Sequence, residues 1–498
     1  MEENKQVSAK QAATEVEESS DFAALLGKQF RPKTDRAKEE ISAAVETLAE
    51  YVLRDTSIVS EDAVESIKAM IAAIDQKLTD QVNQIIHHED FQQLESAWRG
   101  LSYMVNNTET DEFLKIKVMC ISKKDLSKTL RKFKGTMWDQ SPIFKQMYEE
   151  EFGQFGGEPF GCVVGDYYFD HGPQDVETLT QMSKVSAAMH CPFISAVAPK
   201  TLQFDSWGEL SNPRDLTKIF QTPEYAAWRS LRESDDARYI GLAMPRFLSR
   251  QPYGAATDPV EGFDFEEDTD GTDASKYTWC NSAYAMGVNI NRAFKEYGWC
   301  SRIRGIESGG AVEGLPTHTF PTDDGGVDMK CPTEIAISDR REAELAKNGF
   351  MPLIHKKNSD FAAFIGAQSL QKPQEYDKPE ATSNANLAAR LPYLFATCRF
   401  AHYLKCIVRD KVGSFKERED MQRWLNSWIQ KYVDGDPDNS SESTKARKPL
   451  AGAEVVVEED ESNPGYYRSR FYLRPHYQLE GLTVSLRLVS KLPSTMGA

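Results

Sequence analysis

Residues 160–197 contain two β-strand patterns that flank one helical pattern, and this order sets the fold class. Phe160-Gly-Cys-Val-Val164 and Pro192-Phe-Ile-Ser-Ala-Val197 are short apolar runs typical of buried strands. Between them, the run from Pro173 to His190 carries apolar residues at helical spacing. Tyr239-Ile-Gly-Leu-Ala243 continues the series. Strands separated by helices predict a largely parallel α/β sheet.

The same alternation extends in both directions from this core. Leu114-Lys-Ile-Lys-Val-Met-Cys-Ile121 predicts a strand before it, followed by a basic helix through Phe133. After it, we expect helices at 278–297 and 339–348 and short strands at 333–337, 350–354 and 360–365. The fold class is therefore mixed α/β.

The N-terminal region reads as an arm followed by helices. Residues 1–35 are rich in Glu, Lys, Gln, Ser and Ala, a composition typical of disorder. One apolar cluster in this arm, formed by Phe22, Leu25 and Leu26, is a candidate segment that orders on a partner. Helical periodicity recurs in 41–52, 64–78 and 88–101.

The C-terminal region combines helices with a sheet. Helices are predicted at Leu391–Val412 and Lys416–Val433, with polar connectors at 371–388 and 434–448. Ala453-Glu-Val-Val-Val-Glu458 and Phe471–Tyr477 predict strands, and in Leu482-Thr-Val-Ser-Leu-Arg-Leu-Val489 apolar and polar residues alternate. Such a terminal sheet has an edge that must be covered or used. Pro475 lacks an N–H donor, so its strand lies at an edge or carries a bulge.

These patterns divide the chain into five parts. We expect a flexible arm at 1–35, a helical segment at 36–110 and an α/β domain at 111–250. A second α/β region with acidic and Gly-rich loops spans 251–370, and a C-terminal domain of helices and β-strands spans 371–498.

Charge and composition exclude several classes of partner. The formal net charge of −17 argues against nucleic acid as the main partner, because phosphate binding needs a basic face. No run reaches the ~18–20 apolar residues of a membrane helix, and the N-terminus lacks a signal-peptide core. The segment after Pro464 is basic, which predicts either a solvated face or contact with an acidic neighbour. The eight cysteines form no C-x-x-C pair, which is typical of a cytosolic protein without disulfides.

A search for catalytic, cofactor and metal motifs finds none that is complete. Ser308-Gly-Gly-Ala-Val-Glu-Gly-Leu lacks the Gly-Lys-Ser/Thr ending of a phosphate-binding loop. The acidic loop 262–274 and the segment Asp434–Asp438 resemble calcium loops, but each lacks the glutamate that should occupy the twelfth position. We therefore predict no catalytic, cofactor or metal residues. The alternative, a soluble α/β enzyme with dispersed catalytic residues, stays open, because such residues need not be neighbours in sequence.

Three stretches carry a resemblance to a known family. They are Asn463-Pro-Gly-Tyr-Tyr-Arg-Ser-Arg-Phe-Tyr-Leu-Arg-Pro-His-Tyr477 with the strand that follows it, Phe91-Gln-Gln-Leu-Glu-Ser-Ala-Trp-Arg-Gly-Leu101, and Tyr239-Ile-Gly-Leu-Ala-Met-Pro-Arg-Phe247. Together they resemble the large subunit of the contractile sheath of the bacterial type VI secretion system, the TssC/VipB type, related to phage tail sheaths. The resemblance runs from about residue 35 to 493.

This resemblance implies a structural protein of the bacterial cytoplasm without enzyme activity or cofactor. Its implied partners are a small sheath subunit, further copies of itself in a six-fold helical sheath, the inner-tube hexamer and a baseplate. An AAA+ ATPase, acting indirectly or through the small subunit, would disassemble the contracted form. Contraction would drive the inner tube and its effectors out of the cell.

Three sets of residues are therefore candidates for assembly. Because a sheet edge suits strand exchange between subunits, the first set lies in the tail sheet; it comprises Phe471, Tyr472, Leu473, Leu482, Val484, Ser485, Leu486, Arg487 and Leu488. The second set is the arm cluster Phe22, Leu25 and Leu26. By resemblance the C-terminal half faces the lumen, which makes Lys411, Lys416 and Arg418 candidate inner-tube contacts.

Overall fold

The computed structural model describes residues 36, 63–212, 215–322, 324–411, 418–459, 467–476 and 478. The chain packs as two units. The first comprises Met1–Phe91 with Gln251–Asp270, and the second comprises Gln92–Arg250 with Gly271–Ala498. The described part of the first unit consists mainly of α3 (Ala63–Ile86) and the irregular segment 251–270.

A six-stranded sheet forms the centre of the second unit. Its strand order is β1-β2-β3-β9-β10-β6. The first four of these strands pair in parallel, and β10 and β6 add in the antiparallel sense. Their bounds are β1 Val163–Phe169, β2 Phe193–Val197, β3 Ile240–Met244, β9 Phe350–His355, β10 Ala362–Phe364 and β6 Ala311–Val312. The predicted parallel α/β sheet is confirmed.

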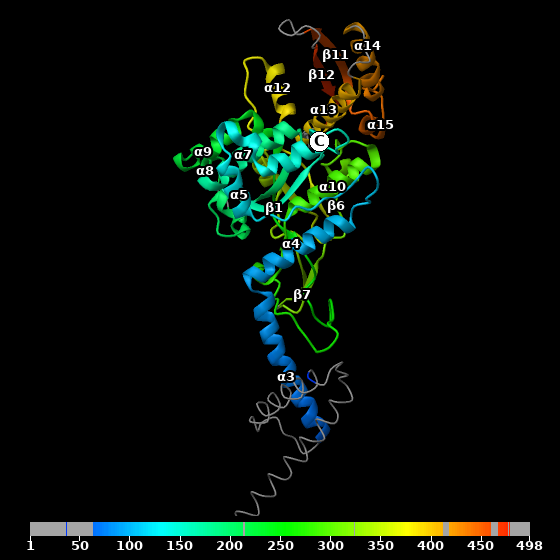
Figure 1. Cartoon of the computed structure of the whole chain (residues 1–498). Coiled ribbons are helices and arrows are strands. Elements are labelled where there is room, and N and C mark those ends of the chain that lie inside the picture. The colour runs from blue at the N-terminus through cyan, green and yellow to red at the C-terminus, as the bar shows by residue number, and fades with distance from the viewer. Residues whose placement is uncertain are drawn as a thin grey trace, which may run out of the picture. The chain divides into compact units, whose positions relative to one another are not determined.

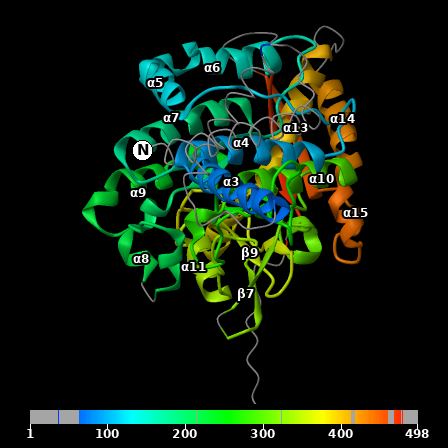
Figure 2. The same ribbon diagram turned by 90° about the horizontal axis from the view of Figure 1, so that it is seen from below.

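Side chains alternate between the two faces of this sheet, as the period of two in a strand requires. Phe193 and Leu242 belong to one core cluster, together with α5 (Lys123–Lys132) and α7 (Pro173–Met189). These two helices lie side by side (Figures 1 and 2). Ile194 and Ala243 point to the other face, where α10 (Ser282–Tyr297) and α13 (Leu391–Lys411) cover them. The sheet is thus buried on both faces.

Local sequence signals explain where the two central helices begin and end. Helix α7 starts with Pro173 in its first turn and ends at His190, which adopts the left-handed conformation. In α10, the Asn281 side chain accepts a hydrogen bond from the Ala283 N–H at 2.9 Å, and Gly298 ends the helix with a φ of 79°.

The remaining elements are shorter or lie outside the sheet. The other α-helices are α4 Glu89–Asn106, α6 Pro142–Phe144, α8 Leu216–Ile219, α9 Ala226–Glu233, α11 Asp339–Lys347, α12 Pro379–Ala388, α14 Arg418–Ile429 and α15 Glu442–Arg447. Two-stranded pairs are formed by β4 Phe247–Leu248 with β5 Trp279–Cys280, β7 His318–Pro321 with β8 Val327–Lys330, and β11 Leu450–Glu459 with β12 Tyr467–Pro475. Short 3₁₀ helices cover 135–140, 199–202, 207–211, 223–225, 235–239, 274–276 and 430–432, and π-helical turns cover 145–152 and 306–310.

Two predicted strands are wrong. Leu114–Ile121 pairs with no strand among the described residues; side-chain contacts hold it instead, including the ion pair between Lys115 and Glu158. Thr333–Ile337 makes only one isolated bridge, between Thr333 and Phe247. There Glu334 turns toward Arg246 and forms a two-pronged ion pair with it at 2.7 and 2.8 Å. Apolar alternation alone cannot predict whether a neighbouring strand lies within reach.

Two segments expected as connectors contain helices. The connector 371–388 includes α12, and the hydrophilic loop 434–448 includes α15. Both helices are mainly polar and contribute little to the core, so apolar periodicity did not reveal them.

Candidate assembly surface

The C-terminal sheet of the described residues is a hairpin of β11 and β12. The strands are antiparallel, with Val455 opposite Phe471 and Glu454 opposite Tyr472. Pro475 is the last residue of β12, and the register shifts opposite it, between Leu450 and Gly452. The missing donor of Pro475 is thus accommodated at a strand end beside a bulge.

One face of the hairpin packs against helices and forms a core of its own. Val455 and Val457 are buried, and they pack with Leu425 and Ile429 of α14. The ring of Trp299 joins this core by stacking on Phe400, with 4.3 Å between the ring centroids. Figure 1 shows β11 and β12 beside α13 and α14 at one end of the second unit. Because Trp299 follows α10, it connects this small core to the α/β body.

The opposite face of the hairpin is exposed and charged. Glu454, Arg470 and Arg474 are exposed, and Tyr472 keeps 56% of its surface accessible. The Arg470 guanidinium lies 3.2 Å from the Glu458 carboxylate on the neighbouring strand. Part of the basic charge predicted for the tail is therefore already balanced within the hairpin.

The outer edge of β11 is covered by side-chain amides of α14 and of Gln430, which begins the 3₁₀ helix after it. Asn426 Nδ2 donates to the Val455 carbonyl at 2.9 Å, and its Oδ1 accepts the Val455 N–H at 3.0 Å. Gln422 Oε1 accepts the Val457 N–H at 3.2 Å, and Gln430 Nε2 donates to the Ala453 carbonyl at 3.0 Å. We call Gln422, Asn426 and Gln430 the amide row. The sequence reasoning missed it, although its four-residue spacing is visible beside the apolar stripe of the helix.

The outer edge of β12 has no such cover among the described residues. In an antiparallel pair, the residues whose backbone groups point outward lie opposite one another. The backbone N–H and C=O of Val455 point to the outer edge of β11, so those of its partner Phe471 point to the outer edge of β12. The backbone groups of Ser469 and Leu473 point to the same edge of β12. In the described part of the chain, no hydrogen bond reaches the backbone of these three residues from beyond the hairpin.

The chain leaving β12 is anchored to the α/β body. Gln478 donates through Nε2 to the Ser301 carbonyl at 3.0 Å and accepts from Arg304 Nε at 3.0 Å. Its backbone N–H donates to the Tyr393 hydroxyl at 2.9 Å. The root of the C-terminal tail therefore has a fixed position in the second unit.

The structure describes only part of the predicted assembly residues. Phe471 and Leu473 face the small core, whereas Tyr472 lies on the exposed face. Lys411 is the last residue of α13 and Arg418 the first of α14. The other candidates lie outside the described residues; they are Phe22, Leu25, Leu26, Lys416, Leu482, Val484, Ser485, Leu486, Arg487 and Leu488.

A groove of about 380 Å³ lies in the second unit next to residues 112–117. Its wall includes Phe294 and Phe395, with the buried His402 also contributing. Burial lowers the pKa of His402 to about 4, even though its Nε2 lies 2.7 Å from the Met189 carbonyl. The imidazole is thus neutral at pH 7 and serves as a core residue.

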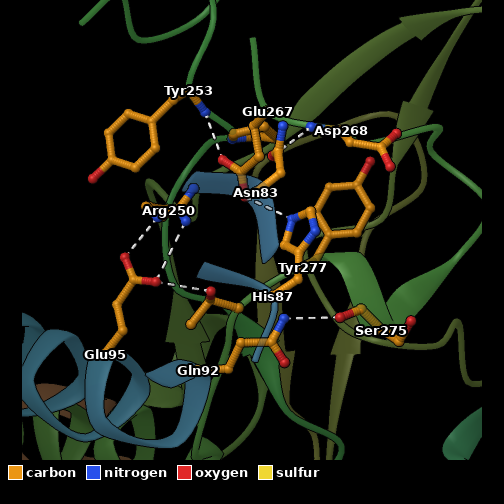
Figure 3. A network of polar contacts seen from close by, with 12 residues as sticks. Asn83, His87, Gln92, Glu95, Arg250, Tyr253, Glu267, Asp268, Ser275 and Tyr277 are labelled. Carbon is orange, nitrogen blue, oxygen red and sulfur yellow. Dashed lines mark hydrogen bonds and ion pairs between the residues drawn. The ribbon is translucent and has the colours of Figure 1, made fainter. Parts of the chain in front are cut away.

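In the first unit, hydrogen bonds organise residues 262–270 of the acidic loop. The Asn83 side chain of α3 donates to the Glu266 carbonyl at 3.1 Å and accepts the Asp268 N–H at 2.9 Å (Figure 3). The buried carboxylate of Glu267 accepts the Tyr253 N–H at 2.8 Å and lies 3.5 Å from His87 Nε2. The Asn83 amide and the Glu267 carboxylate therefore fix the conformation of this segment.

In the second unit, Glu95 of α4 is the centre of a second polar network (Figure 3). Its carboxylate pairs with Arg250 at 2.6 Å and with Arg99 at 2.7 Å, and it accepts the Thr278 hydroxyl at 3.0 Å. Burial alone would raise the pKa of Glu95, but the hydrogen bonds and charges of Arg250 and Arg99 outweigh it and lower this pKa. The carboxylate is held ionised and ties α4 to the chain around residues 250 and 278.

No group of three or more His, Cys, Asp or Glu side chains within the described ranges could hold a metal ion. The segment Asp434–Asp438 forms a turn, in which Asp434 accepts the Asp436 N–H at 3.2 Å. None of the described helices is both long and apolar enough to cross a membrane.

Comparison with known proteins assigns most of the chain to one family. Residues 68–371 match the VipB model, described as the EvpB/VC_A0108 tail sheath N-terminal domain. Residues 380–492 match the VipB_2 model, described as the EvpB/VC_A0108 tail sheath gpW/gp25-like domain. The chain is 75% identical over 488 residues to the type VI secretion system sheath protein TssC1 of Pseudomonas aeruginosa, covering 98% of each chain.

Two solved structures align with part of the chain at low TM-scores. The chain aligns with a chain of the anti-feeding prophage baseplate at a TM-score of 0.34 and 10% identity, covering 64% of this chain and 66% of that one. The contracted helical sheath of the same prophage aligns at a TM-score of 0.30 and 10% identity, with coverages of 62% and 66%.

Proposed function

The chain belongs to the VipB family of tail-sheath proteins and is a structural component of a type VI secretion sheath, and we propose that it polymerises by strand addition at the outer edge of β12. In this mode, a strand from a neighbouring subunit extends the hairpin through backbone hydrogen bonds. The observation that carries the proposal is that the outer edge of β11 is covered, whereas no hydrogen bond from the described residues outside the hairpin reaches the outer edge of β12.

The proposed donor is the tail segment Leu482–Val489, which lies outside the described residues. The alternation of apolar and polar residues in this segment would place its leucines and Val484 on the side of the small core, beside Phe471 and Leu473. Its polar residues, including Ser485, would join the exposed face next to Tyr472. The donated strand would thereby extend both faces of the hairpin with matching chemistry.

The remaining parts of the proposal follow from family membership. We propose that the chain pairs with a small sheath subunit in the bacterial cytoplasm and that these heterodimers form a helical tube around an inner tube on a baseplate. Contraction would move rigid subunits while donated strands keep the lattice connected, a transition between two packings. An AAA+ ATPase would then recycle the contracted sheath.

Further contacts remain proposals within this scheme. The arm residues Phe22, Leu25 and Leu26 are proposed to dock on a neighbour, and Lys411, Lys416 and Arg418 to approach the inner tube. We propose that the basic residues of the tail contact an acidic surface on a neighbouring subunit. Arg470 is an exception, because Glu458 of the same hairpin already balances its charge. We also propose that the chain is organised in the five parts 1–35, 36–110, 111–250, 251–370 and 371–498.

The chain is not an enzyme, because its family consists of structural sheath proteins. The alternative of a soluble enzyme with dispersed catalytic residues is therefore set aside on the ground of family membership.

Electron microscopy of the chain co-expressed with its small sheath partner tests the proposal. We expect regular hollow tubes from the wild type and from Ser485→Thr, which preserves the backbone donor and suits a strand. Ser485→Pro removes that donor and should abolish tubes. Normal tubes from Ser485→Pro would contradict strand addition through this segment.

A further inference from the structure

The groove next to residues 112–117 combines aromatic walls with charged groups. Phe294 of α10 and Phe395 of α13 form part of its walls, and Phe395 is buried. The groove volume of about 380 Å³ lies within the range of about 300–1,000 Å³ that is usual for ligand clefts. A cleft of this size has room for a few side chains of a peptide, but not for a folded domain.

Arg399 of α13 supplies the positive charge of this groove. Its guanidinium lies 5.5 Å from the centre of the Phe294 ring and 4.8 Å from that of the Tyr403 ring. Arg399 is partly buried, and it makes no ion pair or hydrogen bond with any residue that the structure describes. Because burial removes hydration that no carboxylate replaces here, this guanidinium favours an acidic ligand that can accept its hydrogen bonds.

Glu112 supplies a negative charge at the exposed rim of the groove. It also makes no ion pair within the described part of the chain. The remaining charges of the lining are balanced, since Lys115 pairs with Glu158. Lys117 is paired as well, with Glu151. The groove therefore offers a ligand one cationic group, an aromatic surface and one anionic group.

The N-terminal arm, which lies outside the described residues, has the complementary order of groups. Asp21 precedes the apolar cluster of Phe22, Leu25 and Leu26, and Lys28 follows it. An acid, three apolar residues and a base thus fall within the eight residues 21–28. On a helix, positions 21, 25 and 28 would share one face, so both charges and part of the cluster could be presented together.

We propose that the groove next to residues 112–117 receives the arm of a neighbouring copy. The Asp21 carboxylate pairs with the Arg399 guanidinium, and the apolar cluster packs on the aromatic walls. Lys28 then lies at the rim beside Glu112. This inference rests on the arm docking proposed above and names its receptor. In a polymer of sheath subunits every copy supplies both an arm and a groove, so the contact can repeat along the lattice.

Photochemical cross-linking in assembled tubes tests this receptor. The photoreactive amino acid p-benzoylphenylalanine, which keeps an aromatic ring, replaces Phe22 in the full-length chain, and tubes formed with the small sheath partner are irradiated. Denaturing gels separate linked pairs of copies from single chains, and mass spectrometry identifies the modified peptide. We expect linked pairs with adducts in the groove-lining segments 290–300 and 395–402. The same amino acid at Ala24 repeats the test if the variant at position 22 does not assemble.

Charge reversal tests the pair of Asp21 and Arg399. Asp21→Lys should lower the yield of groove adducts about tenfold, because a repulsion replaces a charge-assisted hydrogen bond. Glu3→Lys makes the same charge change elsewhere in the arm and should leave the yield unchanged. Adding Arg399→Glu to Asp21→Lys restores opposite charges and should recover the yield. Arg399→Gln with the wild-type arm removes the charge by a milder change and should also lower the yield about tenfold.

Each other outcome overturns a defined part of the inference. Adducts within single chains overturn the neighbouring copy as the source of the arm. Adducts outside the groove, on another copy or on the small partner, overturn the groove as receptor but leave the arm docking in place. Tubes without adducts at either position overturn the arm docking itself, whereas strand addition is judged separately by Ser485→Pro.

The ion pair has its own contrary results. An adduct yield that either Asp21→Lys or Arg399→Gln leaves unchanged overturns the pairing of Asp21 with Arg399, on which the choice of this groove depends. Tubes of the double variant Asp21→Lys with Arg399→Glu that do not regain the yield overturn it as well.

Discussion

Asn426→Leu is the most direct perturbation of the covered edge. Asn426 makes two hydrogen bonds to Val455, at 2.9 and 3.0 Å, and leucine can make neither. A hydrogen bond contributes about 0.5–1.5 kcal/mol net, so the local stability of β11 should fall by about 1–3 kcal/mol. Because 1.4 kcal/mol is a factor of ten, the Val455 amide should exchange about 5–150 times faster.

Peptide-resolved hydrogen exchange on the full-length chain measures this effect. The neighbouring bonds from Gln422 and Gln430 remain, so the faster exchange should centre on Val455. Ser427→Ala, on the exposed side of the same helix, should leave the exchange rate unchanged. If Asn426→Leu changes the exchange of Val455 by less than about twofold, the contact does not protect the edge, and the reasoning about the amide row fails.

Three further predictions concern packing, pH and the arm. Trp299→Ala should lower the free energy of unfolding by about 3–5 kcal/mol and speed proteolytic release of the C-terminal sheet. As a control, Trp98→Ala, at a side chain 67% exposed, should lower it by less than about 0.5 kcal/mol. Equal proteolysis of the two variants would contradict the anchoring role of Trp299. Burial lowers the pKa of His402 from 6.5 to about 4. Between these two pH values the unfolded chain therefore binds more protons than the folded chain. About 3 kcal/mol of the free energy of unfolding should be lost as the pH falls from 6.5 to 4. His402→Gln keeps a donor for the Met189 carbonyl and should lose less over this range in denaturant unfolding; an identical pH profile would contradict the burial argument. Replacing the arm residues Phe22, Leu25 and Leu26 by aspartate should reduce the yield of sedimentable sheath. An unchanged yield would contradict a docking role for the arm.

The parts of the fold that the sequence predicted are those with strong local signals. Helix α7 and strands β2 and β3 combine apolar periodicity with clear boundaries, and the structure places them as expected. Pro475 indicated that its strand lies at a sheet edge or carries a bulge, because a residue without an N–H cannot donate to a ladder. In the structure it is the last residue of β12, and the register shifts opposite it.

The missed features depend on tertiary placement. Leu114–Ile121 has strand-like alternation but finds no partner strand among the described residues, so a local pattern alone was misleading. The contact between Asn426 and Val455 joins residues 29 positions apart and exists because α14 lies beside β11. Its spacing was visible in the sequence, but its role required knowing which strand edge the helix covers.

Electron cryo-microscopy of the assembled sheath can identify the strand that lies beside each edge of the hairpin. We expect a third strand along the outer edge of β12, traced to residues 482–489 of a different copy, with the amide row still bonded to β11. A sheath in which the β12 edge is exposed to solvent, or in which the added strand lies on β11, would contradict it.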